Sequence, residues 1–122
     1  MPAASQGKTA VWVASDDDAN QVSISWAWYP VYRAADEALF QELAAQGQSV
    51  FVASGDSGTF VAWDLTYPAD SNYVTSVGGS TLETSGAGGS WGAETAWSRS
   101  GGGVSLNKVL IPDWQTLAVN TS

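Results

Sequence analysis

Histidine and cysteine are both absent from the 122 residues of this chain. Without cysteine there is no disulfide framework, no thiol nucleophile and no cysteine-rich zinc site. Without histidine there is neither a histidine-based catalytic triad nor an ordinary imidazole metal cluster. Any catalysis by this chain must therefore depend on carboxyl and hydroxyl groups.

Basic residues are scarce, with 4 Lys and Arg against 12 Asp and Glu, for a formal net charge of -8. Nucleic acids and anionic membranes recruit clusters of Lys and Arg, so we expect neither as a partner. The apolar runs are too short to span a membrane, and the first residues lack the basic and apolar regions of a signal peptide. The low charged fraction of 13% is typical of secreted or acid-exposed proteins.

Three consecutive segments have the periodicity of an α/β fold. Residues 22–28 alternate large and small side chains, which predicts a strand with two different faces. Apolar positions at helical spacing predict a helix over residues 31–46, ended by Gly47. The apolar run at residues 50–53 is typical of a strand buried on both faces of a parallel sheet. The sequence predicts an α/β fold, mainly a parallel sheet flanked by helices.

The other segments are shorter. Residues 1–9 are small and polar and predict an irregular start, and residues 111–115 predict a turn into a helix. Further strands and glycine-rich loops are expected in chain order at residues 10–14 (strand), 73–77 (strand), 81–83 (strand of the same sheet), 84–92 (loop) and 101–103 (loop).

A Gly-Asp-Ser-Gly motif at residues 55–58 follows the predicted buried strand, where parallel sheets place their chemistry. As a chymotrypsin-like motif with Ser57 as nucleophile, it fails for want of a histidine base. As the Asp-Ser-Gly signature of aspartic proteases, it would place Asp56 in a dimer whose two aspartates share one proton. Those folds are nearly all β, whereas a predicted helix leads into this motif.

Six segments, in one order and at plausible spacing, carry a resemblance to a known family. They span about residues 10–118 and are 22–28, 44–58, 67–82, 94–97, 101–105 and 112–115. In these segments the chain resembles the sedolisins, which are serine-carboxyl peptidases with a subtilisin-like fold. The resemblance implies a secreted, extracellular serine-type endopeptidase that hydrolyses peptide bonds of peptides or proteins at acid pH.

The resemblance also implies roles for individual residues. Asp56 matches the aspartate that lines the family's oxyanion hole, and a carboxyl group can donate there only when it is protonated. Ser25, Trp26 and Ala27 match the strand that pairs with the extended substrate, and Gly55 is assigned to the same substrate-binding group. The family usually has glycine at the position of Ala27, whose methyl group would narrow the cleft.

The rest of the family's catalytic machinery has no match in this sequence. No glutamate is followed four residues later by an aspartate, and the Gly-Thr-Ser sequence that carries the nucleophile does not occur. The family's calcium loop lies further downstream, so no cofactor is expected in this chain. Residues 10–122 are therefore expected to be part of a catalytic domain, inactive without the rest of that domain as a partner.

Two other interpretations come from residues outside the motif. Asp16, Asp18 and Asn20 are spaced like the start of a calcium loop, but glycine and glutamate are missing later in it, which favours a solvated loop. The 7 tryptophans suit a carbohydrate-binding module that stacks sugars on exposed rings. Such modules are usually β-sandwiches, which the helix predicted at residues 31–46 contradicts.

Overall fold

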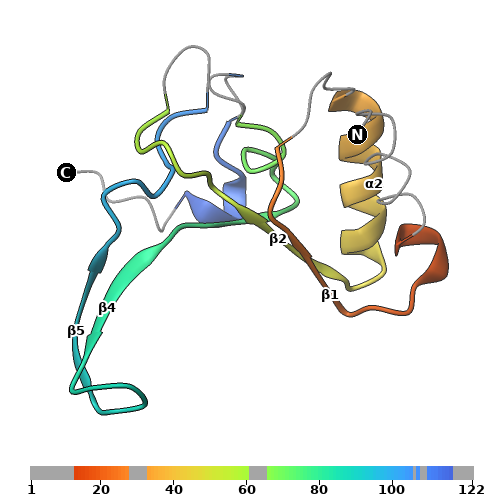
Figure 1. Cartoon of the computed structure of the whole chain (residues 1–122). Helices are drawn as coiled ribbons and strands as arrows, with labels where there is room; N and C mark the ends of the chain where they lie inside the picture. The colour runs from red at the N-terminus through yellow and green to blue at the C-terminus, as the bar shows by residue number, and fades with distance from the viewer. Residues whose placement is uncertain (1–12, 28–32, 61–65, 106, 108–109, 117–122) are drawn as a thin grey trace.

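A three-stranded parallel sheet packed against one helix forms the centre of the structure. The computed structural model describes residues 13–27, 33–60, 66–105, 107 and 110–116. Its elements in chain order are β1 (Gln21–Ile24), α2 (Arg33–Ala45), β2 (Ser49–Ala53), β3 (Thr75–Val77), β4 (Ser80–Thr84), β5 (Trp91–Ala96) and the 3-10 helix η1 (Asp113–Gln115). Strands β1, β2 and β3 are parallel and adjacent in that order (Figure 1). The predicted α/β class is confirmed.

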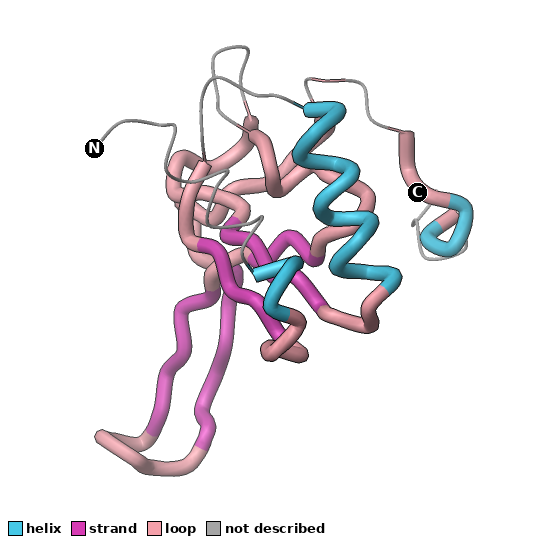
Figure 2. The backbone as a smooth tube through the Cα atoms, turned by 90° about the vertical axis from the view of Figure 1, so that its right-hand side faces the viewer, coloured by secondary structure: helices cyan, strands magenta, loops and turns pink. Residues whose placement is uncertain are grey.

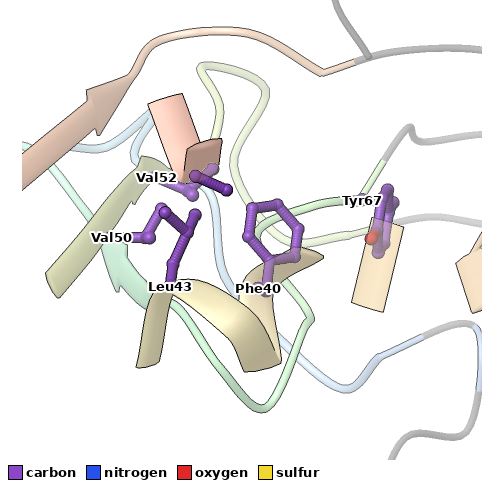
Figure 3. Close-up of a cluster of buried hydrophobic side chains, with 6 residues drawn as sticks. Phe40, Leu43, Val50, Val52 and Tyr67 are labelled. Atoms are coloured by element: carbon purple, nitrogen blue, oxygen red, sulfur yellow. The ribbon is translucent and has the colours of Figure 1, made fainter. Parts of the chain in front are cut away.

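Helix α2 supplies one half of the core. Its sequence is rich in Ala, Leu, Glu and Gln, which are good helix formers, and Gly47 follows it with a φ of +80°. Phe40 and Leu43 lie three residues apart, so they share the face that meets Val50 and Val52 of β2 (Figure 3). The buried side of the helix and alternate residues of β2 therefore pack directly together.

The second face of the sheet is open within the described residues. In β2, Val50 and Val52 are buried, whereas Phe51 is half-buried and Ala53 is exposed. On the neighbouring strand Val77, which pairs with Ala53, is 46% exposed. The expectation that β2 is buried on both faces is therefore wrong for the described part of the chain, where only the face toward α2 is covered.

Two predicted strands differ from the structure. Residues 13–16 form a helical turn, in which Ala14 is buried and its carbonyl oxygen accepts a hydrogen bond from Gln46 Nε2 (3.0 Å). Residues 80–84 do not continue the parallel sheet; they form β4, which pairs antiparallel with β5. The resulting hairpin projects away from the sheet (Figures 1 and 2), and Gly78 and Gly79 separate it from β3. The loop expected at residues 84–92 is correspondingly shorter, since Thr84 pairs with Trp91.

The segment at residues 66–71 is tied to three parts of the molecule. Tyr67 is buried with its ring 6.3 Å from that of Phe40, which joins this segment to the core (Figure 3). Ser71 Oγ donates to Glu37 Oε2 of α2 (2.8 Å). Asp70 Oδ2 accepts hydrogen bonds from Thr66 Oγ1 (3.1 Å), Ser105 Oγ (2.8 Å) and Asn107 Nδ2 (2.7 Å). These contacts hold the segment in place beside the carboxyl end of β2.

The fold bears on the other interpretations of the sequence. A parallel sheet with a packed helix is neither the nearly all-β fold of the aspartic proteases nor a β-sandwich. The exposed indoles of Trp26, Trp91 and Trp114 lie after β1, in β5 and in η1, on three different segments. None of the helices that the structure describes has the length and apolar character needed to cross a membrane.

Candidate functional site at the carboxyl ends of β1 and β2

Two hollows meet where β1 and β2 end. The first, of about 440 Å³, lies on the open face of the sheet and extends to Trp97. The second, of about 400 Å³, lies between residues 25–27 and residues 66–69. The residues that line both hollows are Ser25, Ala53, Gly55 and Asp56. Asp56 therefore stands at the junction of the two.

Strand register brings these residues together. Ile24 pairs with Val52 in the parallel ladder, so the residues that follow each strand leave the sheet at the same edge. All five residues that the sequence assigned to the site line the second hollow, namely Ser25, Trp26, Ala27, Gly55 and Asp56. The sequence separates them into two groups almost 30 positions apart, and the sheet places them around one space.

The substrate-binding segment predicted at residues 25–27 is exposed. The alternation seen in the sequence holds for Val22 and Ile24, which are half-buried against the core, but Trp26 is 66% exposed. The predicted strand is shorter than expected, since β1 ends at Ile24, and Trp28 lies outside the described residues. In the described part of the chain β1 is an edge strand, because β2 is its only hydrogen-bonded neighbour there.

A tight loop presents Asp56. Gly55 and Gly58 have φ values of +100° and +78°, which L side chains rarely adopt, so glycine is required on both sides of Asp56. Asp56 itself is exposed. The side chain is free to face a bound molecule in either hollow.

Residues 99–101 hold the Asp56 loop through hydrogen bonds to its backbone. The Gly101 N–H donates to the Gly55 carbonyl oxygen (2.8 Å) and the Gly58 N–H donates to the Arg99 carbonyl oxygen (2.9 Å). Arg99 Nε donates to the carbonyl oxygen of Asp56 (3.0 Å). The glycine triplet at 101–103 thus belongs to the support of the Asp56 loop. The sequence carried no signal for Arg99, because its partner lies 43 positions away.

Buried residues form the wall of the second hollow opposite residues 25–27. Thr66, Tyr67 and Pro68 are buried and Ala69 is half-buried. Ser54 also lines this hollow, and its buried Oγ has no hydrogen-bond partner among the described residues. Sequence reasoning missed Ser54 and Thr66 as lining residues; Ser54 belongs to a segment that carried the resemblance, and Thr66 directly precedes another.

The chemistry available in the two hollows is limited. Among the described residues that line them, Asp56 has the only carboxyl group. Among the described residues no group of three or more acidic side chains is placed to hold a metal ion. Besides this carboxyl group, the lining residues offer the hydroxyl groups of serine, threonine and tyrosine side chains.

Sequence comparison finds relatives that match this chain over part of their length. Xanthomonalisin from Xanthomonas sp. (strain T-22) is 35% identical, over 69% of this chain and 15% of its own length. Sedolisin from Pseudomonas sp. (strain 101) is 31% identical, over 88% of this chain and 22% of its own length. Kumamolisin from Bacillus sp. (strain MN-32) is 36% identical, over 80% and 20% respectively. No family model matches the sequence. The chain therefore spans at most 22% of the relatives named.

Proposed function

From this partial homology to the sedolisin-family serine-carboxyl peptidases, we propose that the chain is a substrate-binding and oxyanion-stabilising part of a secreted acid endopeptidase. Its substrates are peptides or proteins. The remainder of the catalytic domain supplies the carboxyl base, its partner carboxyl group, the serine nucleophile and the family's calcium site. The chain alone is inactive, because its sequence has neither a glutamate followed four residues later by an aspartate nor a Gly-Thr-Ser sequence.

The observation that carries the proposal is the gathering of all five assigned residues around the second hollow. The five residues belong to two segments, 25–27 and 55–56, which follow different strands. The parallel pairing of β1 with β2 brings these segments together. A substrate paired with the free side of β1 would run past Ser25, Trp26 and Ala27 toward Asp56. Its side chain next to the scissile bond would enter the second hollow, against Thr66 and Pro68.

Asp56 contributes through hydrogen bonding in this proposal. Attack of a serine on the scissile carbonyl places negative charge on the carbonyl oxygen, and a protonated Asp56 carboxyl donates a hydrogen bond to that oxygen. An ionised carboxylate would repel the same oxygen, so the site needs acid.

A chimeric enzyme tests the proposal. The segment of Pseudomonas sedolisin that aligns with this chain is replaced by the chain, because the alignment covers 88% of the chain. We expect peptidase activity at acid pH, and a loss of about 100- to 1,000-fold in kcat on Asp56→Ala, the usual effect of removing one oxyanion-hole donor. Asp18→Ala is the matched control, because Asp18 is exposed and precedes the opposite end of β1.

Two results would contradict the proposal. The first is an active chimera in which Asp56→Ala has no more effect than Asp18→Ala. The second is acid peptidase activity of the purified chain alone, lost on Ser57→Ala or inhibited by pepstatin, which would favour one of the other interpretations of the motif.

A further inference from the structure

We propose that Arg99 is a positioning residue for the Asp56 carboxyl group. The inference rests on the proposed function of Asp56 and concerns a side chain to which the resemblance assigns no role. Arg99 lies in the turn after β5, and its Nε donates to the carbonyl oxygen of Asp56 (3.0 Å). It acts on the geometry of Asp56 and does not itself contact the substrate.

The direction of the Asp56 side chain is set by the two peptide planes that flank its Cα atom. A residue has only two soft backbone torsions, so fixing both neighbouring planes fixes the direction of the Cα–Cβ bond. The preceding plane is held through the Gly55 carbonyl oxygen by the Gly101 N–H (2.8 Å). The following plane is held through the Asp56 carbonyl oxygen by Arg99 Nε. Each plane therefore has its own hydrogen bond.

Only the second of these bonds comes from a side chain. The Gly101 bond is made by backbone and survives any side-chain substitution at position 99. Arg99 also makes a reciprocal contact, because its own carbonyl oxygen accepts from the Gly58 N–H (2.9 Å). Arg99 is therefore hydrogen-bonded to both ends of the segment Asp56–Gly58, through its side chain to Asp56 and through its backbone to Gly58. This segment includes the positive φ of Gly58.

The guanidinium group is itself restrained. It lies 5.7 Å from the ring centroid of Trp97, within the range of a cation–π contact. Trp97 is half-buried, and its backbone N–H donates to the carbonyl oxygen of Gly79 (3.0 Å), which anchors Trp97 beside the first hollow. A restrained donor loses less conformational entropy when it binds its acceptor. This makes Arg99 suited to holding the loop although it is exposed.

The donor atom makes a sharp choice of variants possible. In glutamine the amide nitrogen stands at the same position along the side chain as the Nε of arginine, whereas lysine has a carbon atom there. Arg99→Gln therefore keeps a donor at this position and loses the charge, whereas Arg99→Lys keeps the charge and moves its donor one atom further along the side chain. Positioning predicts activity for the glutamine variant, and a purely electrostatic effect predicts activity for the lysine variant.

Kinetics of the sedolisin chimera provide the first test. We expect Arg99→Ala and Arg99→Lys to lower kcat about tenfold with KM within about twofold, and Arg99→Gln to stay within about threefold of the parent. In the Asp56→Ala background, Arg99→Ala should lower kcat less than about twofold, because both changes act through one carboxyl group. Arg33→Ala, at the other arginine of the chain, serves as the charge control.

The possible failures are distinguishable. Multiplying effects of Arg99→Ala and Asp56→Ala, or rescue by lysine but not by glutamine, would overturn the role of Arg99 while leaving that of Asp56 intact. An Asp56→Ala chimera with the activity of the parent would overturn the proposed function itself.

A second test uses the 122-residue chain itself and does not depend on enzyme activity. Amide hydrogen exchange by NMR should be about tenfold faster at Gly58 in Arg99→Ala and Arg99→Lys than in the parent and in Arg99→Gln. The amide of Val52 in β2 reports whether the fold is intact. Unchanged exchange at Gly58 in the alanine variant would contradict the positioning role, even if the chimera could not be purified.

Discussion

The Cα atom of Gly101 lies so close to Ser54 that a side chain at position 101 would overlap the Ser54 carbonyl oxygen. The two backbones approach because the Gly101 N–H reaches the carbonyl oxygen of Gly55. The segment after β5 is therefore packed directly against the end of β2, at the start of the loop that carries Asp56. Glycine is the only residue that allows this approach.

Substitution of this glycine should be costly. We expect Gly101→Ala to lower the free energy of unfolding by about 1–3 kcal/mol, because the conflict is with backbone atoms that cannot rotate away. Gly102→Ala is the matched control, since an added Cβ there would meet no atom within 4 Å. Urea denaturation followed by circular dichroism measures both, and equal stability of the two variants would contradict the close packing.

Replacement of Asp56 by asparagine should change the pH dependence of the chimera. A carboxyl group donates only when protonated, so its contribution is present at low pH and is lost as the pH rises, whereas an amide donates at every pH. We expect Asp56→Asn to keep a larger fraction of its acid activity at about pH 6 than the parent does. The measurement is the ratio of kcat at about pH 6 to kcat at acid pH, taken for the parent chimera and for the variant. An unchanged ratio in an active variant would count against Asp56 as a protonated donor.

Truncation of the core should separate buried from exposed leucines. Leu43 is 2% exposed and lies between α2 and β2, whereas Leu110 is 83% exposed. Leu43→Ala is expected to lower the free energy of unfolding by about 2–5 kcal/mol through lost burial and a cavity. Leu110→Ala should change it by less than about 0.5 kcal/mol. Thermal denaturation of the two variants gives the comparison, and similar melting temperatures would refute the assigned core.

The Asp70 carboxylate should stabilise one wall of the second hollow. Its Oδ2 accepts from Thr66, Ser105 and Asn107, so Asp70→Ala leaves several donors without this acceptor. We expect a loss of about 1–3 kcal/mol in unfolding free energy, together with faster amide exchange at Asn107, whose N–H donates to Ser105 Oγ. Asp18→Ala should have neither effect. Unaltered exchange at Asn107 would show that the carboxylate does not hold this segment.

Local elements with a strong pattern follow directly from the amino-acid sequence. Helical spacing and Gly47 gave the correct place of α2, and the apolar run gave the place of β2, because short-range periodicity reports which faces are apolar. The resemblance to the sedolisins that the motif segments carry is confirmed by the similarity to xanthomonalisin, sedolisin and kumamolisin. The strand predicted at residues 10–14 was wrong at residues 13–14, and its residues 10–12 lie outside the described part of the chain. The strand predicted at residues 81–83 is present but pairs with β5 outside the parallel sheet, because a few β-branched residues do not specify which partner they meet.

Contacts between segments far apart in the sequence follow only from the tertiary structure. Parallel register between β1 and β2 brought residues 25–27 beside Asp56, and the return of the chain after β5 placed Arg99 and Gly101 behind it. Both are contacts between residues far apart in sequence. No local periodicity encodes such contacts, because they depend on the packing of α2 against one face of the sheet and on where the chain turns back.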